Sequence, residues 1–438
     1  MFSLKKSRFT VAVPVENKGQ EIVALYQTMT GAFILILEKT WAYALSDPIA
    51  PADSATTDLL HEQGFLVKDG VDETTVFENW KQQHVHHFST LKSKVLVTRK
   101  CNNRCRYCIL DPEAKDMSSG TALAMDQFYI ETMEEKGPQK VEDDYLGGEP
   151  LLNSKIIMES VARRFFYCMG KGIDYGFVIT TNGTLVRPAV ISDMKKVGLT
   201  GIRVSLAGPA PVHDALRPSK HNGKTYELIM ENLQAISGMV PISVECQYDS
   251  GALDYLRVPE MLDDMAERNI GIDNIAFTPI LPRRRRNLYN SGMGDPNIFL
   301  YLNREAGQRG YPINSEAPLN TCMADFRSRF VFDTDGSIIP CPSLQGSEMA
   351  YGHVNTGIDF VAESQLLKRA LPDRCLKECE LLPTCMGGCR LQALTNQNDF
   401  GGADCHYDTY RLLLEEYIRE KAEATCLEHS FTGLKDAA

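Results

Sequence analysis

The sequence of 438 residues lacks three features that would place it in other classes of protein. Its longest hydrophobic run, residues 31–37, is far shorter than the ~20 residues that span a bilayer. The first nine residues contain no apolar core segment of a secretory signal. Positive charge is not in excess, and the net charge of −11 argues against nucleic acid or an anionic membrane surface as the main partner. We therefore expect a soluble, cytoplasmic protein of about three domains.

Cysteine, by contrast, is abundant. Thirteen cysteines in a cytoplasmic chain indicate metal ligation rather than disulfide bonds. Cys101, Cys105 and Cys108 lie within eight residues, directly after the apolar residues 95–97. Ligation by sulfur alone favours zinc or an iron–sulfur cluster. A closed zinc site would need a fourth ligand, which the local sequence does not supply, whereas a four-iron cluster on three thiolates leaves one iron open.

Strand-like and helix-like patterns alternate between residues 94 and 281. This alternation predicts an α/β architecture of parallel strands joined by right-handed crossovers, with the chemistry at the carboxyl ends of the strands. The predicted strands are residues 94–98, 141–147, 175–181, 201–206, 242–248 and 274–281. The predicted helices are residues 122–136, 154–169, 187–197, 226–237 and 258–268.

Polar motifs follow these strand ends. Gly147, Gly148 and Glu149 come directly after the second strand, and Asn182 comes at the end of the third. The glycines allow the backbone to approach a ligand closely, and the carboxylate can accept a hydrogen bond from a ligand ammonium group. We therefore expect a ligand above this edge of the sheet.

The fourth and fifth strands alternate in polarity. Arg203 and Ser205 should face the barrel interior, because their apolar neighbours should pack against the helices. The same test places Glu245 inside, where it is a plausible catalytic residue in contact with cofactor or substrate. It points Cys246 towards the helices, which favours a buried side chain over a hydrogen-atom donor.

The C-terminal third contains seven further cysteines in an ordered spacing. Seven thiolates are too many for one four-iron cluster and one short of filling two. A zinc-binding module is the alternative. The residues are Cys322, Cys341, Cys375, Cys379, Cys385, Cys389 and Cys405.

The CxxxCxxC spacing of Cys101, Cys105 and Cys108, with Tyr107 before the last cysteine, resembles the radical S-adenosylmethionine (SAM) superfamily. Four separated motifs follow the order of that family. The resemblance implies a partial (β/α)6, TIM-like barrel and a 4Fe–4S cluster whose open iron binds SAM. Ala207 stands where relatives commonly have Asp, so the contact there stays open. The residues that the resemblance implies for SAM binding are Tyr107, Gly147, Gly148, Glu149, Asn182, Ser205 and Arg217.

The order of the seven later cysteines resembles the SPASM domain of radical SAM proteins, except that three residues rather than two separate Cys375 and Cys379. The resemblance implies two auxiliary 4Fe–4S clusters, and thus three clusters in all. The first auxiliary cluster would keep an open iron or take a ligand that the sequence does not identify. Its ligands would be Cys322, Cys341 and Cys389, and those of the second Cys375, Cys379, Cys385 and Cys405.

The pattern of residues 1–90 predicts a small domain. Its predicted strands are residues 8–15, 21–26, 32–37 and 64–67, and its predicted helical stretches are residues 38–46 and 58–63. This order resembles the winged-helix recognition elements that bind leader peptides of ribosomally made, modified peptides. Strand addition is the binding mode that we expect, and a structural cap is the alternative. The remaining predicted domains are a barrel at 91–290, a linker at 291–321 and the SPASM domain at 322–438, which ends in a closing helix.

Together these resemblances imply an enzyme that cleaves SAM reductively and abstracts hydrogen through a 5′-deoxyadenosyl radical. The leading hypothesis is a maturase that installs a cross-link or related modification in a precursor peptide. The alternatives are a tetrapyrrole or other small-molecule substrate, and a non-catalytic iron–sulfur electron carrier. A sulfatase-maturing role is less favoured, because Pro342 stands where an Asp follows the cysteine in those enzymes.

The expected second partner is a low-potential electron donor, flavodoxin or ferredoxin. The arginine run at residues 283–286 is either a solvated loop or a docking site for an acidic peptide or an acidic donor.

Overall fold

The computed structural model describes residues 3–17, 19–46, 54–108, 115–221, 223–280, 295–312, 322–344 and 346–428. All the predicted cluster cysteines lie in these ranges, whereas the arginine run at residues 283–286 lies outside them. No helix in the described ranges is both long and apolar enough to cross a membrane.

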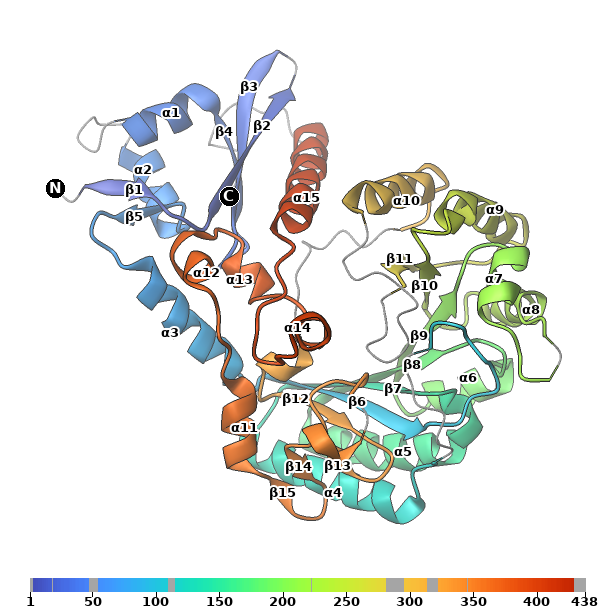
Figure 1. Ribbon diagram of the computed structural model, residues 1–438. Coiled ribbons are helices and arrows are strands. Elements are labelled where there is room, and N and C mark those ends of the chain that lie inside the picture. Colours follow the sequence, from blue (N-terminus) through green and yellow to red (C-terminus); the bar gives the residue numbers. More distant parts are fainter. Residues whose placement is uncertain are drawn as a thin grey trace.

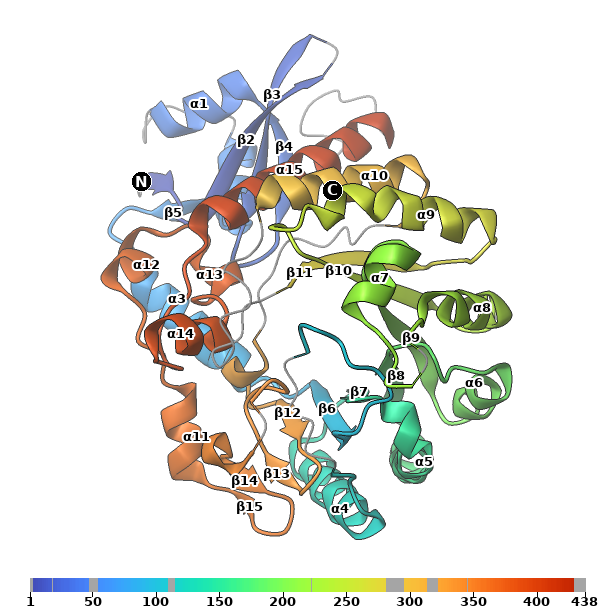
Figure 2. The same ribbon diagram turned by 45° about the vertical axis from the view of Figure 1, so that its right-hand side comes forward.

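The central element is an open, curved sheet of parallel strands in the order β11-β10-β9-β8-β7-β6. Helices run along its outer side, and the concave side faces the C-terminal part of the chain (Figures 1 and 2). The predicted α/β partial barrel is confirmed, and it does not close. Its strands are β6 (Thr90–Thr98), β7 (Lys140–Gly147), β8 (Asp174–Thr181), β9 (Leu199–Leu206), β10 (Ile242–Tyr248) and β11 (Asn274–Pro279).

The outer helices close the core against the sheet. Local signals set their ends: the Ser118 side chain accepts from the Thr121 N–H at the start of α4, and Gly137 ends that helix in the left-handed conformation. These elements are α4 (Ser119–Lys136), η1 (Pro150–Asn153), α5 (Ser154–Lys171), α6 (Pro188–Lys195), α7 (Ala210–Leu216), α8 (Tyr226–Ile236), η2 (Asp254–Arg257) and α9 (Val258–Glu267).

Alternation along β10 follows the predicted pattern. Ile242, Val244 and Cys246 are buried in the core between sheet and helices, whereas Glu245 and Gln247 are partly exposed on the opposite, interior face. The prediction that Cys246 is a buried core residue is confirmed.

The C-terminal segment (residues 322–428) is joined to the barrel by strand pairing. Strand β12 adds to β6 in parallel, so that one ten-stranded sheet runs from β11 to β15. Its elements are η3 (Met323–Asp325), β12 (Arg329–Phe332), β13 (Ser337–Ile338), η4 (Ser347–Met349), β14 (Gly352–His353), β15 (Gly357–Ile358), α11 (Phe360–Leu367), α12 (Asp373–Glu378), α13 (Leu382–Cys385), α14 (Arg390–Gln397) and α15 (Tyr407–Glu428). Helix α10 (Pro296–Gln308) lies within the stretch that the sequence assigns to a linker and contacts α9 and α15.

The N-terminal segment (residues 3–85) contains an antiparallel sheet in the order β2-β3-β4. One face packs against α15, and the other packs against α1 and α2 (Figure 1). Strand β1, which pairs with β5, and helix α3 are absent from the sequence prediction. The elements are β1 (Leu4–Lys6), β2 (Thr10–Asn17), β3 (Gln20–Gln27), β4 (Phe33–Leu37), α1 (Glu38–Ser46), α2 (Ser54–Glu62), β5 (Leu66–Lys68) and α3 (Glu73–Val85).

The N-terminal segment is docked onto α12 and the turn that follows it. The Leu376 carbonyl accepts from Arg8 Nη1 at 2.5 Å and from Thr74 Oγ1 at 2.9 Å. The Glu380 carbonyl accepts from Thr28 Oγ1 at 2.6 Å. An apolar cluster around the buried residues Phe9, Phe77 and Leu382 includes the side chains of Cys375 and Cys379. Two of the predicted cluster ligands therefore pack against the N-terminal segment.

Candidate functional site

The cysteine loop (residues 101–108) follows the carboxyl end of β6. Backbone hydrogen bonds hold it against the chain that follows α7, with Arg104 N donating to the Pro218 carbonyl at 2.7 Å and Lys220 N to the Asn102 carbonyl at 2.8 Å. The loop thus lies at the edge of the sheet where the other predicted site residues also end.

Gly147 and Gly148 make room for the backbone that leads into this loop. A Cβ on Gly147 would lie 2.2 Å from the Thr98 carbonyl oxygen, and one on Gly148 would lie 2.1 Å from that of Lys100. Gly148 N donates to the Thr98 carbonyl at 2.8 Å. Sequence reasoning assigns these glycines to the approach of a ligand, whereas in the structure the group that approaches them is the cysteine loop's own backbone.

Glu149 is completely buried behind this contact. Its carboxylate accepts from Thr181 Oγ1 at 2.7 Å, from Asn182 N at 2.8 Å and from Leu151 N at 3.1 Å. Burial raises the pKa of the carboxyl group, although these three donors stabilise the charged form. Glu149 therefore joins the end of β7 to the end of β8.

Asn182 reaches from the end of β8 to the cysteine loop. Its Nδ2 donates to Asn102 Oδ1 at 2.8 Å and lies 3.8 Å from the Cys101 sulfur. Its Oδ1 accepts from Thr184 N at 3.0 Å, which fixes the orientation of the amide. The side chain therefore positions the first cysteine of the loop.

A second set of hydrogen bonds connects the cysteine loop to β10 and to the end of α7. It involves Tyr107 of the loop, Arg217 and Gln247. The Tyr107 hydroxyl donates to Gln247 Oε1 at 2.8 Å and accepts from Arg217 Nη1 at 2.5 Å, while the same Nη1 donates to Gln247 Oε1 at 3.0 Å. Arg217 is buried, and burial raises the pKa of the tyrosine hydroxyl. Gln247 was missed as a site residue; in the structure it lies on the interior face of β10, next to the buried Cys246.

The groups around the loop fit a metal cluster and a polar ligand. Burial, with smaller contributions from Cys105 and Cys108, raises the pKa of the Cys101 thiol to about 11. Thiols of this kind ionise when a cation binds them. Arg217 Nε and both side-chain polar atoms of Asn103 are buried without a hydrogen-bond partner in the described part of the chain. Such groups are what a bound polar ligand would satisfy.

Further inside the barrel, polar side chains form a row across the six strands from β6 to β11. Asp144 on β7 accepts from Thr180 Oγ1 at 2.8 Å and from Arg203 Nη1 at 3.2 Å, and it lies 3.5 Å from Lys94 Nζ. Beyond Arg203, Ser205 is in register with Glu245 on β10. The Glu245 carboxylate accepts from Thr278 Oγ1 on β11 at 3.1 Å. The predicted interior positions of Arg203, Ser205 and Glu245 are confirmed, whereas Lys94, Asp144 and Thr180 were missed.

The seven C-terminal cysteines fall into two groups by their mutual electrostatic effects. In the first, burial raises the pKa of Cys322, followed by the charge of Asp325 and a smaller contribution from Cys341. Burial also raises the pKa of Cys341, with a smaller contribution from Cys389. The nearby charge of Lys94 opposes the increase at Cys341. The second group comprises Cys375, Cys379, Cys385 and Cys405.

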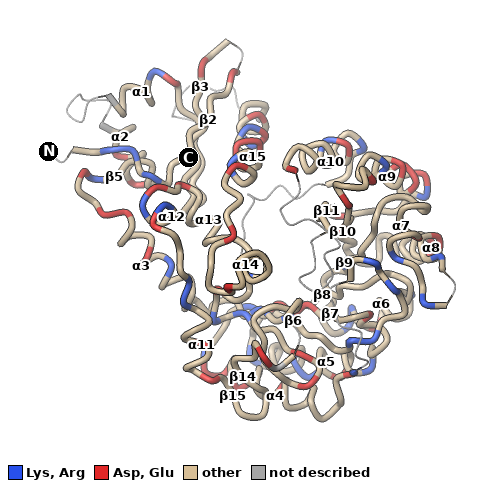
Figure 3. Tube along the Cα trace, in the orientation of Figure 1, with Lys and Arg blue, Asp and Glu red and all other residues tan. Residues whose placement is uncertain are grey.

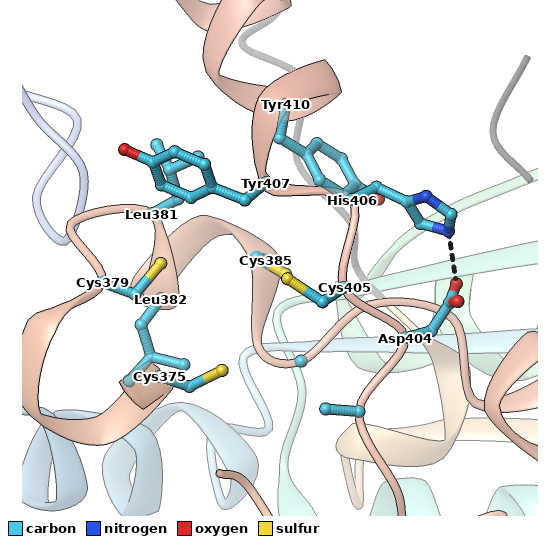
Figure 4. A pocket seen from close by; sticks show the side chains of 12 residues that line it. Cys375, Cys379, Leu381, Leu382, Cys385, Asp404, Cys405, His406, Tyr407 and Tyr410 are labelled. Carbon is cyan, nitrogen blue, oxygen red and sulfur yellow. Dashed lines mark hydrogen bonds and ion pairs between the residues drawn. The ribbon is translucent and has the colours of Figure 1, made fainter. Parts of the chain in front are cut away.

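The second group lines one pocket (Figure 4). Leu381, Leu382, Tyr407 and Tyr410 supply its apolar wall, and His406 Nε2 lies 3.0 Å from an Asp404 oxygen at its edge. Among the described residues, no three His, Cys, Asp or Glu side chains converge closely enough to hold a single metal ion. A four-iron cluster binds each thiolate through a different iron, so its ligands need not converge on one point.

One family model, described as Radical SAM superfamily, matches residues 95–246, which contain the cysteine loop and Glu149. The chain contains a radical SAM domain and is a radical SAM enzyme. SAM and an iron–sulfur cluster are therefore its cofactors.

Similar proteins of known sequence include two that are named as enzymes. The GTP 3′,8-cyclase of Helicobacter pylori is 21% identical over 268 residues, which cover 57% of this chain and 79% of that protein. The Fe-coproporphyrin III synthase of Methanosarcina barkeri is 32% identical over 149 residues, which cover 31% of this chain and 33% of that protein.

Two kinds of solved structure share the fold over most of their length. The structure of anSMEcpe with bound AdoMet is 17% identical, with a TM-score of 0.59, and covers 77% of this chain and 100% of that chain. Streptococcus suis SuiB, bound to the precursor peptide SuiA, is 15% identical, with a TM-score of 0.54, and covers 92% of this chain and 99% of that chain.

A buried ion-pair network connects the ligand segments of this radical SAM enzyme's C-terminal part. Asp325 accepts from Arg390 Nε at 2.8 Å and from Arg369 Nη1 at 3.1 Å, and these side chains are at most 4% exposed. Arg369 also donates to the carbonyls of Gly387 and Gly388, between Cys385 and Cys389. The network ties together segments that carry ligands of both predicted auxiliary clusters.

Proposed function

We propose that this radical SAM enzyme is a peptide maturase that abstracts hydrogen from a ribosomally made precursor peptide to install a cross-link or related modification. When bound, the iron–sulfur cluster and SAM would supply a 5′-deoxyadenosyl radical for that step. Cys101, Cys105 and Cys108 would hold the cluster. The other two cysteine groups would hold two auxiliary clusters. Glu245, in the barrel interior, would contact the substrate.

The chain's own residues would position SAM through three parts of the site. Asn182 and Glu149 fix the first cysteine and the backbone that leads to it. Tyr107 and Arg217, held together by Gln247, form the opposite side. Ser205 and Glu245 continue the polar surface into the barrel, where a substrate C–H group would be oriented and water excluded.

The observation that carries the peptide assignment is the sheet of the N-terminal segment, which has a strand edge suited to peptide addition. In the described residues β4 pairs only with β3, and it contains no proline. The opposite edge strand, β2, contains Pro14, which cannot donate to an added strand. A peptide that adds to β4 would lie beside α15, because Lys421 Nζ of that helix lies 4.9 Å from the centre of the Phe33 ring.

Two fold relationships add support. SuiB, whose structure holds the precursor peptide SuiA, covers 92% of this chain, and anSMEcpe has also been solved with AdoMet and a peptide. The N-terminal segment is fixed to the C-terminal segment through Leu376 and Glu380, so a bound peptide would be held at a constant position relative to the barrel.

The test uses point variants, because deletion of residues 1–90 would uncover Cys375 and Cys379. Gln27 N donates to the Ala32 carbonyl, so antiparallel alternation points the N–H of Phe33 away from β3. Phe33→Pro removes that outward N–H and the ring, whereas Phe33→Ala, the matched control, removes only the ring. Anaerobic reactions with SAM, a reductant and each small peptide encoded beside the gene would be followed by mass spectrometry.

We expect one peptide to change mass in reactions with the parent enzyme and with Phe33→Ala. The same peptide should bind Phe33→Pro roughly tenfold more weakly, because that variant loses one hydrogen bond at the strand edge and weakens the adjacent ones. Equal binding of that peptide by both variants would refute strand addition at β4. Deoxyadenosine formation with every peptide unchanged would refute the peptide substrate.

A small-molecule substrate is the second candidate. It is favoured by the sequence relatives, which are named as a GTP cyclase and a porphyrin synthase. The N-terminal segment would then be a structural cap. Deoxyadenosine that accumulates with GTP or a porphyrin, but with no peptide, would establish this candidate.

A further inference from the structure

One short loop carries a ligand of each predicted auxiliary cluster. Residues 385–389, which we call the ligand loop, begin with Cys385 of the second group and end with Cys389 of the first. Met386, Gly387 and Gly388 between them have positive φ angles of 48°, 94° and 77°. This conformation is strained at Met386, so the loop needs contacts that hold it. The loop contains no charged residue, and neither does α13, which leads into it (Figure 3).

The side chain of Arg369 supplies such contacts. Its Nη2 donates to the Gly387 carbonyl and, at 2.7 Å, to the Gly388 carbonyl. Its Nη1 donates to Asp325 Oδ2 at 3.1 Å, and Asp325 Oδ1 accepts from Arg390 Nε at 2.8 Å. The Arg369 side chain is 1% exposed and that of Asp325 is 4% exposed. Two buried guanidinium groups therefore share one carboxylate, which leaves one positive charge in excess within this trio.

One donor of Arg369 has no partner among the described residues. Its Nε is buried without a hydrogen bond in that part of the chain. It lies beside the pocket of the second cysteine group, because Gly387 lines that pocket and a Cβ on Gly387 would lie 2.7 Å from this nitrogen. A buried N–H without an acceptor is costly, and the sulfur atoms of a bound cluster would supply an acceptor. The unpaired donor therefore fits a bound group that is rich in acceptor atoms.

The charge of Arg369 reaches ligands of both groups. Burial raises the pKa of three of these thiols, and the positive charge of Arg369 opposes the increase at each of them. The three thiols are those of Cys375, Cys385 and Cys389. At Cys389 the carboxylate of Asp404 acts in the opposite direction and more strongly than Arg369. The effect of Arg369 should therefore be smaller on the first group than on the second.

We propose that Arg369 is a positioning residue that raises the reduction potential of both auxiliary clusters, through its buried positive charge and its hold on the ligand loop. This inference rests on the proposed function, which includes these clusters. Reduction of a four-iron cluster takes up one electron from an external reductant and moves no proton, so the cluster becomes one unit more negative. A fixed cation in buried surroundings of low dielectric constant favours that reduced form, and hydrogen bonds to cluster sulfurs act in the same direction.

The test measures reduction midpoints rather than activity. In the full chain carrying Cys101→Ala/Cys105→Ala/Cys108→Ala only the auxiliary clusters can load, and about eight iron atoms per chain are expected. Anaerobic titration with dithionite is followed by electron paramagnetic resonance, which detects the reduced clusters. In this background Arg369→Gln removes the cation and Arg369→Lys keeps it. Lys368→Gln is the matched control, because it removes one exposed charge from the neighbouring residue.

We expect Arg369→Gln to lower the equilibrium constant for reduction about tenfold at one cluster, or about 59 mV for one electron, and at least threefold at the other. Arg369→Lys should stay within threefold of its parent, because the charge remains. Lys368→Gln should change neither midpoint by more than twofold, because solvent screens an exposed charge. A shift below twofold at both clusters in Arg369→Gln would overturn the proposal. So would equal shifts in Arg369→Gln and either of the other two variants.

Should Arg369→Gln lose its iron, Asp325→Asn decides the question, because it keeps both guanidinium groups and removes the negative charge. The midpoints should then rise, and a fall or no change would overturn the proposal.

The titration also separates this inference from the proposed function, because it needs neither SAM nor peptide. Midpoints that shift as expected, with every peptide left unchanged by the unaltered chain, would support the inference and refute the peptide substrate. If the background variant bound no iron, the inference would be overturned, while peptide modification by the unaltered chain would still decide the proposed reaction.

Discussion

The buried ion pair between Arg99 and Asp333 should couple the stability of the C-terminal segment to the cysteine loop. Arg99 lies two positions before Cys101, and Asp333 follows β12. The Arg99 side chain is 8% exposed and that of Asp333 is fully buried. Arg99 Nε donates to Asp333 Oδ1 at 3.2 Å, and Nη2 donates to Oδ2, so the pair is bidentate.

The perturbation is Asp333→Ala, which leaves the buried guanidinium without its counter-charge. Breaking one side of such a pair typically costs about 3–5 kcal/mol. The variant also loses the bonds that Asp333 accepts from Thr334 N at 2.6 Å and from Gly346 N at 3.2 Å. The double variant Arg99→Met/Asp333→Leu leaves no charge unpaired, and it should therefore recover about 1–2 kcal/mol of the loss.

Chemical unfolding followed by circular dichroism would measure the free energy of unfolding, and calorimetry would measure SAM affinity. Lys100, next to Arg99, accepts from Glu149 N through its carbonyl at 2.8 Å, so a displaced Arg99 should also shift the SAM site. We expect SAM affinity to fall roughly tenfold in Asp333→Ala.

Two results would refute this reasoning. A loss of less than 1 kcal/mol would mean that the pair is solvated in solution. If the free energy of unfolding fell by the full predicted amount but the variant that remains folded bound SAM with unchanged affinity, the pair would be only structural and would not position the loop.

Three further predictions follow from other contacts. Gly148→Ala would place a methyl group 2.1 Å from the Lys100 carbonyl oxygen, so we expect loss of iron at the cysteine loop by elemental analysis; full iron content would contradict this. Arg164 is fully buried, and its guanidinium nitrogens lie 2.7 Å from an oxygen of Asp126 and 2.9 Å from an oxygen of Asp143. Arg164→Met should therefore lower the free energy of unfolding by about 3–5 kcal/mol, and a decrease below 1 kcal/mol would contradict this prediction. Burial raises the pKa of Asp254 from 3.8 to about 6, so the folded state binds an extra proton between these values and this contribution to stability falls as the pH rises from about 4 to 6. Asp254→Asn should flatten that part of the pH profile of the unfolding free energy, and an unchanged profile would show that the group is not perturbed.

Most of the barrel could be predicted from the sequence because its signals are local. Apolar runs with short polar interruptions mark the strands, and β10 even reveals which side chains face inside. The pairing of β12 with β6 could not be predicted, because β12 has only four residues and its partner lies far away in the sequence. Strand β1 and its pairing with β5 were missed for the same reason.

The parts of the site that could be predicted are those where the residue type by itself indicates the chemistry, as cysteine does for metal binding. Cysteine spacing predicted the cluster ligands, and four of the C-terminal seven, Cys375, Cys379, Cys385 and Cys405, line one pocket. Gln247 and Asp144 are ordinary polar residues whose roles depend on what lies opposite them, so no local pattern marks them. The glycines of residues 147–148 show the reverse case: their small size was noted, but the backbone that requires it comes from another strand.

The most direct test of the central claim is the ratio of deoxyadenosine to modified peptide in an anaerobic reaction of the cluster-loaded full chain with SAM and a reductant. We predict that one peptide encoded beside the gene changes mass, and that deoxyadenosine forms in a fixed ratio to the modified product. The account would be contradicted if cluster-loaded protein formed no deoxyadenosine, or formed it at one constant rate while every peptide stayed unchanged.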